Sequence, residues 1–253
     1  MAVPHPRPIF VLGNQKSGTT AIASLLATAL GERYSHDMSF TRKWQDIERI
    51  CNGCVTVREL VRRAPRDFAA GVIKNPDYTF IYRSLADHFE AARFVLVIRD
   101  PRQNIRSILN RLAIPGHLET LSPGEWQKLE AAPAWKRVFD ARSQGLTHEQ
   151  YISVLAARWR RCLETVLGGQ DRVTLVRYED FTRDKWTCLL DLADSLGRPV
   201  VADARHMLDR QFQPAGMSNS DPLEFFGRRN LASIESICAE HMKTFRYAPM
   251  LLQ

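Results

Sequence analysis

The feature that most constrains the fold is an apolar run followed directly by a glycine-rich loop and a helical pattern. The run is Ile9–Leu12, the loop is Gly13–Thr20, and apolar residues then recur at helical spacing over Ile22–Leu30. A loop of this kind directs successive backbone N–H groups and a helix N-terminus at an anion. This order predicts a buried parallel strand whose following loop binds a phosphate group.

This loop differs from the phosphate-binding loop of nucleotide triphosphatases at one position. Their lysine directly follows the second glycine, but here Thr19 follows Gly18 and the lysine is Lys16, inside the loop. In addition, the apolar run at residues 94–98 ends at Arg99 rather than at an acidic residue that would bind Mg²⁺. We therefore keep a P-loop kinase acting on a small molecule only as the alternative enzyme.

Three more apolar runs predict buried strands, at residues 71–74, 94–98 and 173–176. Helical patterns alternate with or follow them, at residues 101–112, 151–166, 185–196 and 231–246. Asp100 and Pro101 have the residue types of a helix N-cap and a first helical position. Alternating strands and helices predict an α/β fold, with a P-loop-like parallel sheet flanked by helices on both faces, in a single domain over residues 1–253.

Residues 111–150 differ from the rest of the chain, because proline and glycine interrupt their short helical pieces. We expect a helical lid insertion within the domain that takes part in ligand binding, since long irregular insertions often carry binding residues. Its aromatic residues Trp126, Trp135 and Phe139 can stack on a flat ligand or form a small core of the insertion itself, and both alternatives stay open.

The net charge indicates an anionic partner without identifying it. The 253 residues include 35 Lys and Arg against 28 Asp and Glu, a formal net charge of +7 with neutral histidine. Such an excess suits a nucleic acid, a membrane surface or a phosphorylated small molecule. A basic protein that binds nucleic acid or another anion is therefore the alternative outside the enzymes, and arginine pairs such as Arg62–Arg63 and Arg228–Arg229 agree with it.

The cysteines and the lengths of the apolar stretches bear on metal binding and location. Five cysteines are an odd number in a chain of this length, so we expect reduced thiols. Cys51 and Cys54 form one C-x-x-C pair without a second pair or a histidine partner, so we expect a turn there and no metal site. No apolar stretch approaches the ~20 residues of a membrane span, and the opening residues lack the apolar core of a signal peptide. We therefore expect a cytoplasmic protein.

The loop and a second segment resemble the signature of sulfotransferases that use 3′-phosphoadenosine 5′-phosphosulfate (PAPS). Lys16–Thr20, with the sequence KSGTT, matches the family's loop at every position. Arg99 and Ser107 follow the strand at residues 94–98 with the eight-residue separation of the family's pair that binds the 3′-phosphate. A guanidinium at a strand end and a hydroxyl two turns into the next helix can converge on one phosphate.

Three further segments resemble parts of the same family. Lys74 begins the sequence KNPDY, which resembles the segment whose lysine reaches the sulfuryl group in tyrosyl-protein sulfotransferases. Tyr178 lies in the sequence RYEDF, like the tyrosine that lies near the adenine in the family. Arg228 and Arg229 lie in FGRRNL, which is similar to the C-terminal segment that closes over the nucleotide.

The resemblance implies in-line transfer of a sulfuryl group from PAPS to a hydroxyl or an amine, releasing adenosine 3′,5′-bisphosphate (PAP) without a metal ion. It implies that Lys16 stabilises charge on the bridging oxygen and that Lys74 contacts the sulfuryl oxygens. The 5′-phosphate would be held by four backbone N–H groups, those of Ser17, Gly18, Thr19 and Thr20. The acceptor would be a small molecule, a glycan or a natural product bound at residues 111–150, rather than a nucleic acid or a membrane.

The acceptor must lose a proton, so the site needs a general base. Pro76 stands where many cytosolic members have a histidine, which excludes the simplest assignment. In tyrosyl-protein sulfotransferases the base is a glutamate 21 residues after the first residue of the loop, and the same count from Lys16 gives Asp37. A short strand emerging beside the loop would bring either His36 or Asp37 to the site. We favour Asp37, and the possibility that both are ordinary loop residues stays open.

Overall fold

The structure is a computed structural model that describes residues 2–37, 49–50, 52–139, 150–210, 212 and 221–251. The chain divides into two compact units. The first consists of Met1–Arg99 and Glu164–Pro214, and the second of Asp100–Leu163 and Ala215–Gln253. The organisation of residues 1–253 as a single domain stays a prediction.

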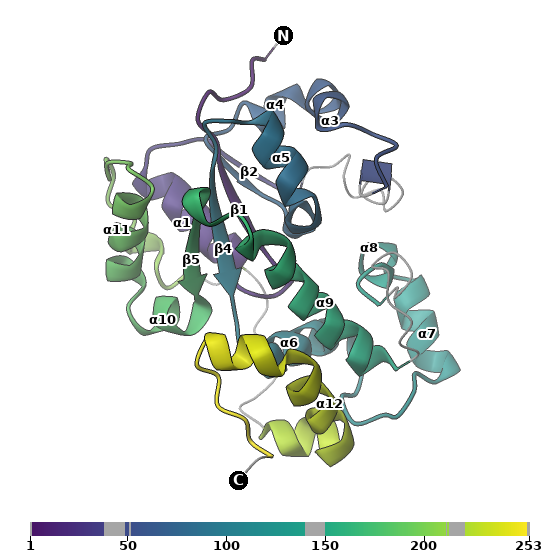
Figure 1. The fold of residues 1–253 in the computed structure, drawn as a ribbon. Helices are drawn as coiled ribbons and strands as arrows, with labels where there is room; N and C mark the ends of the chain where they lie inside the picture. Colours follow the sequence, from purple (N-terminus) through teal and green to yellow (C-terminus); the bar gives the residue numbers. More distant parts are fainter. Residues whose placement is uncertain are drawn as a thin grey trace. The chain divides into compact units, whose positions relative to one another are not determined.

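The first unit is built around a parallel sheet (Figure 1). Its strands lie in the order β2-β3-β1-β4-β5, and every neighbouring pair is parallel. Their bounds are β1 Ile9–Gly13, β2 Tyr34–His36, β3 Val72–Lys74, β4 Arg93–Ile98 and β5 Val173–Arg177. The predicted parallel α/β sheet is therefore confirmed, and each predicted apolar run forms a strand.

The two faces of this sheet carry different kinds of side chains. Successive residues of a strand point to opposite faces, so Val11 lies on one face and Phe10 on the other. Val11 belongs to an aliphatic core with residues of α1 (Thr19–Ala29) and α11 (Lys185–Ser195). Phe10 stacks on Phe94 with ring centroids 5.4 Å apart and belongs to an aromatic cluster that includes Phe68 and Phe89.

Helices cover both faces, as predicted. In Figure 1, α1 and α11 lie on one side of the sheet and α5 lies on the other. The remaining short elements of this unit are α3 Val57–Arg63, α4 Pro65–Phe68, η1 Pro76–Ile81, α5 Tyr82–His88, η3 Gln170–Arg172, α10 Tyr178–Arg183 and η4 Arg205–Met207. The segment η1, directly after β3, is the one that matters most for the site below.

The second unit is helical. It contains α6 Pro101–Leu112, α7 Pro123–Glu130, α8 Pro133–Lys136, α12 Pro222–Thr244 and most of α9 Tyr151–Leu167. The predicted start of α6 is confirmed, because Pro101 is its first residue and the Asp100 carboxylate accepts a hydrogen bond from the Arg102 N–H.

The predicted helix at residues 231–246 corresponds to the second part of α12 (Pro222–Thr244), which the non-helical residue Gly227 divides into two helical parts. The first residue of α12 is Pro222, and the Asp221 side chain accepts a hydrogen bond from the Leu223 N–H. Asp-Pro is the same start signal that predicted α6. Here, however, Gly227 follows only five residues later, so the short helical part before it was not predicted. Gly227 has φ 67° and kinks the helix there, so Arg228 and Arg229 lie in a helix just after the kink.

Residues 111–150 contain the two short helices α7 and α8, and residues 140–149 of this insertion lie outside the described residues. Three hydrogen bonds within the second unit hold the first residues of this insertion in place. Asn230 Nδ2 donates to the carbonyl oxygens of Gly116 and Leu118, both at 2.8 Å, and the Tyr151 hydroxyl donates to the Pro115 oxygen at 2.6 Å. Side chains of α9 and α12 therefore hold the start of the insertion.

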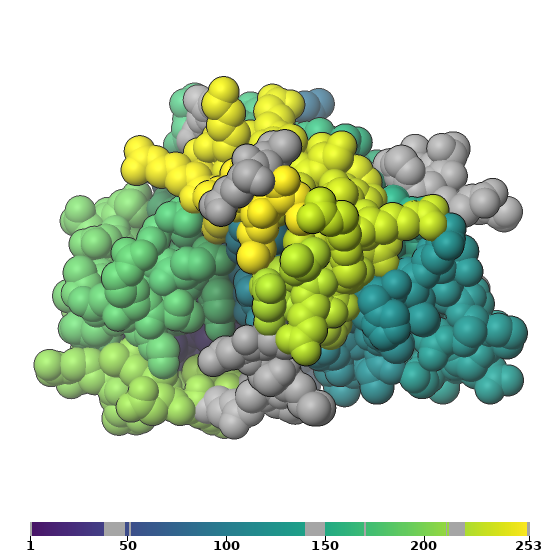
Figure 2. Space-filling model, turned by 90° about the horizontal axis from the view of Figure 1, so that it is seen from below, coloured from purple at the N-terminus to yellow at the C-terminus, as the bar shows by residue number. Residues whose placement is uncertain are grey.

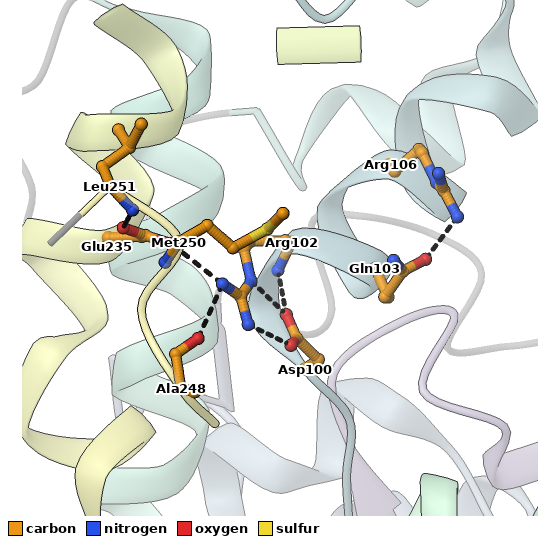
Figure 3. A network of polar contacts seen from close by, with 8 residues as sticks. All are labelled: Asp100, Arg102, Gln103, Arg106, Glu235, Ala248, Met250 and Leu251. Carbon is orange, nitrogen blue, oxygen red and sulfur yellow. Dashed lines mark hydrogen bonds and ion pairs between the residues drawn. The ribbon is translucent and has the colours of Figure 1, made fainter. Parts of the chain in front are cut away.

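The second unit has a buried cation with two carboxylate partners (Figure 3). The Arg102 guanidinium donates to both oxygens of Asp100, at 3.0 and 2.6 Å, and to Glu235 Oε1 at 2.8 Å. Arg102 and Glu235 are 6% and 7% exposed. Burying such charges is favourable only when their hydrogen bonds are satisfied, and here the pairing joins the first turn of α6 to α12.

The same cluster fixes the C-terminal residues. Arg102 also donates to the Ala248 carbonyl oxygen at 2.9 Å, and Glu235 accepts from the backbone N–H groups of Met250 and Leu251. In Figure 2, the yellow C-terminal residues accordingly lie directly on the yellow-green residues of α12. One buried arginine and one buried glutamate therefore bind three chain segments.

Replacement of Arg102 by methionine leaves Glu235 as a buried carboxylate without its cation. Breaking a buried ion pair on one side costs about 3 kcal/mol or more, so we expect the free energy of unfolding of Arg102→Met to fall by about that amount. Urea denaturation measures the change. The matched control is Arg205→Ala, which breaks an ion pair with Asp203 that is exposed on both sides. Equal unfolding curves for the two variants would contradict the role of the cluster.

Candidate active site

The predicted site residues of the first unit lie at one edge of its sheet. Because all five strands are parallel, their carboxyl ends meet at the same edge, where α/β proteins bind ligands. At or directly after these ends come the loop with Lys16, then His36 and Asp37, Lys74, Arg99 and Tyr178. The topology therefore brings together residues that are scattered over 160 positions of sequence.

The loop after β1 has two residues in the left-handed region of the backbone. Lys16 has φ 66° and Gly18 has φ 91°. Gly18 is the N-cap of α1, offers no side-chain hydrogen bond to the first turn, and no acidic residue lies in that turn. A helix start without an anionic side chain of its own suits an anion supplied by a ligand.

Residues of η1 hold this loop in place. The Gly13 N–H donates to Thr79 Oγ1 at 2.9 Å, and the Thr79 hydroxyl lies 3.3 Å from the Gly13 oxygen. Gln15 Nε2 donates to Asp77 Oδ1 at 2.9 Å. Thr79 and Asp77 are buried. Sequence analysis missed these supporting residues, although Asp77 and Thr79 are polar residues directly after the predicted Lys74 segment.

Asp37 pairs with Lys74 across the neighbouring strands β2 and β3. Lys74 Nζ lies 3.0 Å from Asp37 Oδ1 and 2.9 Å from Oδ2, and the Asp37 N–H donates to the Lys74 oxygen at 3.0 Å. The lysine side chain is 4% exposed and the aspartate side chain 40%. A buried ammonium thus has a counter-ion whose side chain is partly exposed.

The position of β2 differs from the expectation. Its neighbour is β3, so β3 separates it from β1, and the short strand does not emerge directly beside the loop. The register pairs His36 with Lys74, which explains why Asp37 reaches the lysine. His36 itself is exposed, and its ring stacks on Tyr34 with centroids 5.1 Å apart.

Tyr34 is a third polar group beside Asp37. Its hydroxyl is buried with no hydrogen-bond partner among the described residues. Burial, together with the negative charge of Asp37, raises the pKa of Tyr34 far above its usual value. Tyr34 therefore stays protonated at neutral pH, which excludes it as a general base.

Arg99 and Tyr178 contact the loop from the ends of β4 and β5. Arg99 Nη1 donates to the Lys16 carbonyl oxygen at 2.9 Å. The Arg99 guanidinium carbon also lies 4.7 Å from the centre of the Tyr178 ring, a cation–π distance. A Cβ atom added at Gly18 would fall 2.3 Å from two carbons of that ring. The ring therefore packs directly against the glycine.

The other predicted site residues belong to the second unit. Ser107 is half-buried in α6, and Arg228 and Arg229 are exposed in α12. Arg229 forms an ion pair with Glu119. In the insertion, Trp126 is 44% exposed, whereas Phe139 is buried.

Among the described residues, no group of three or more His, Cys, Asp or Glu side chains could hold a metal ion. Cys54 is an exposed free thiol, and Cys51 lies outside the described residues. Burial raises the pKa of the Cys162 thiol to about 12, so it is not a thiolate at neutral pH.

No helix in the described part of the chain has both the length and the apolar character that a membrane span requires.

Comparison with known proteins identifies the family. The model of the sulfotransferase family matches residues 29–203, more than half of the chain, so this protein belongs to the sulfotransferase family. The matched segment includes Asp37, Lys74, Arg99 and Tyr178 and begins after the loop Gly13–Thr20. No curated protein sequence matches the chain significantly.

Solved structures show the same fold. Sulfotransferase STF9 from Mycobacterium avium is 14% identical with a TM-score of 0.57, over 96% of this chain and 78% of that one. Mouse sulfotransferase SULT7A1 in complex with PAP is 11% identical with a TM-score of 0.53, over 98% and 91%. The sulfotransferase domain from the curacin biosynthetic pathway is 16% identical with a TM-score of 0.51, over 99% and 100%.

The contact between Gly18 and Tyr178 can be tested by stability. Alanine at position 18 adds the strain of a positive φ and also displaces the tyrosine ring. The matched control is Gly197→Ala, because Gly197 has φ 63° and nothing within 4 Å of an added Cβ. We expect Gly197→Ala to cost about 1 kcal/mol of unfolding free energy and Gly18→Ala clearly more. Equal losses in urea denaturation would show that the ring does not need the glycine.

Proposed function

We propose that this protein transfers the sulfuryl group of PAPS to a hydroxyl or an amine of an acceptor and releases PAP. The observation that carries the proposal is that the sheet of a sulfotransferase-family chain gathers the KSGTT loop, Lys74 and Arg99 at its carboxyl edge. Two lysines and an arginine there suit a donor that carries phosphates and a sulfate. The mouse sulfotransferase of the same fold, solved with PAP, supports this choice of donor.

Donor binding would use the groups that the family resemblance indicates. The 5′-phosphate would accept hydrogen bonds from the backbone of residues 17–20, at the start of α1. Arg99, with Ser107 from α6, would bind the 3′-phosphate, and Tyr178 would lie near the adenine. Arg228 and Arg229 are the proposed residues of the segment that covers the nucleotide.

Catalysis would then consist of positioning and charge stabilisation. The Lys16 ammonium would stabilise the negative charge that develops on the oxygen between sulfur and phosphorus as the bond from sulfur to that oxygen breaks. Lys74 would contact the sulfuryl oxygens. One positioned donor of this kind is typically worth about 10²–10³ in rate, and the chemistry needs no metal ion.

Asp37 is the proposed general base. Lys74 contacts both of its oxygens and thereby orients the carboxylate. The aspartate side chain is 40% exposed, so an acceptor hydroxyl can approach it. His36 remains the second candidate, because it is exposed one residue away.

The acceptor would bind at residues 111–150, within a single sulfotransferase domain. The exposed Trp126 supports this proposal, because an aromatic ring in a long insertion can stack on a sugar or a flat natural product. The buried Phe139 instead supports a small core of the insertion itself. Each alternative from the sequence is thus supported by a different residue.

The two competing functions predict different requirements. A P-loop kinase would need ATP and Mg²⁺ for turnover. A nucleic-acid-binding protein would bind DNA or RNA in a salt-dependent manner that PAP does not compete with. The family match supports neither of them.

The role of Lys16 is tested by Lys16→Ala. We expect the variant to stay folded and to lose sulfotransfer by about 10²-fold or more, because the departing phosphate loses its cation. The assay is incubation of labelled PAPS with candidate acceptor pools, after a titration that confirms PAP binding by the unchanged protein. Lys243→Ala, at an exposed lysine of α12, is the control. Full activity of Lys16→Ala would remove Lys16 from the site.

The identity of the base is tested by comparing Asp37→Asn with His36→Ala at saturating PAPS. We expect Asp37→Asn to lower the rate by at least about tenfold, within the usual range of acid–base contributions, and His36→Ala to lower it less. Circular dichroism checks that Asp37→Asn folds, since it leaves the buried Lys74 without a counter-ion. If neither rate falls tenfold, the base is another residue.

A further inference from the structure

We infer that Tyr178 is a positioning residue that acts on the anion-binding loop through its ring face, by fixing both Gly18 and the Arg99 guanidinium. This role is separate from the adenine contact that the family resemblance implies. It deepens the proposed function, on which its connection to donor binding rests. The contacts that carry it all lie within the first unit.

Strand pairing places Arg99 and Tyr178 side by side. The last paired positions of β4 and β5 are Ile98 and Arg177, and Arg99 and Tyr178 are the residues that directly follow these two strand ends. The arginine guanidinium carbon lies 4.7 Å from the ring centre. A planar cation stacked on an aromatic face is restrained in both position and tilt.

The restrained guanidinium contacts the loop at its most strained residue. Arg99 Nη1 donates to the Lys16 carbonyl oxygen at 2.9 Å. Lys16 has φ 66°, a conformation that glycine adopts readily and lysine does not. Glycine cannot replace it, because the side chain is the proposed catalytic group. Neighbouring contacts must therefore hold this backbone, as is usual for strain at functional sites.

The same ring also packs directly against the loop at Gly18. The Tyr178 carbons Cδ2 and Cε2 occupy the space where a Cβ of residue 18 would lie, so the ring covers Gly18. Both contacts, with Gly18 and with the Arg99 guanidinium, are made by the ring of Tyr178. One side chain thus bears on the loop twice, directly at Gly18 and through Arg99 at Lys16.

This inference predicts a loop that is ordered before any ligand binds. We therefore test it first without a ligand, by hydrogen exchange of the backbone amides over Gly13–Thr20. Tyr178→Leu removes the ring and should speed exchange of these amides by about twofold to thirtyfold, the range for the loss of one cation–π contact. Tyr178→Phe keeps the ring and should keep the slow exchange of the loop.

The control is Arg205→Ala. Arg205 lies 5.6 Å from the Trp186 ring, so this variant breaks a comparable arginine–ring pair outside the site, and the loop should exchange as before. If Tyr178→Leu does not fold, Arg99→Gln breaks the second contact and should speed exchange in the same way. Unchanged exchange of the loop in the folded variant would overturn the inference.

The second measurement is a double-mutant cycle in which calorimetry measures the affinity for PAP. If Tyr178 acts partly through Arg99, the double variant Tyr178→Leu, Arg99→Gln loses clearly less PAP affinity than the two single variants predict. Its fold loss is then smaller than the product of the two single fold losses. A loss equal to that product would mean that the tyrosine contacts only the nucleotide, and would overturn the inference. Absence of PAP binding by the unchanged protein would instead refute the proposed function and leave the exchange result standing.

Discussion

The first unit depends on one constraint, the parallel direction of all five strands of its sheet. Parallel pairing places every carboxyl end at the same edge, so residues that follow different strands meet there without any long-range sequence signal. The loop after β1, the Asp37–Lys74 pair after β2 and β3, and the Arg99–Tyr178 pair after β4 and β5 are all products of that geometry. The buried aliphatic and aromatic layers on the two faces keep the edge in place.

Sequence reasoning was reliable where the signal is local. Apolar runs bounded by glycine or proline predicted the strands, and the order of run, loop and helical pattern predicted α1. The family resemblance indicated the residues at the strand ends. The contacts among the site residues were not predictable from the sequence. The hydrogen bond between Gly13 and Thr79 and the ion pair between Asp37 and Lys74 both depend on which strands are neighbours. The expectation that β2 lies beside the loop was wrong for the same reason.

The two units use charge differently. In the second unit, Arg102 is almost fully buried and donates hydrogen bonds to Asp100, Glu235 and the Ala248 oxygen. This arrangement has a structural role. In the first unit, the buried Lys74 has a carboxylate partner that remains partly exposed. The first arrangement stabilises three chain segments, while the second keeps an ionic group accessible at the edge of the sheet. The start of α12 shows the limit of local signals, since a short helical part that was not predicted precedes the non-helical residue Gly227.

The place of β5 in the chain has a consequence for biosynthesis. This strand lies at the edge of the sheet next to β4, but all residues of the second unit up to Leu163 are synthesised between the two strands. Closing such a long chain segment delays pairing, so β1, β3 and β4 can assemble on the ribosome well before β5 joins them. Tyr178 arrives with β5, and the ring that covers Gly18 is therefore added at the end of sheet assembly. A nascent chain would have the sequence of the loop after β1 early and its ordered form only late.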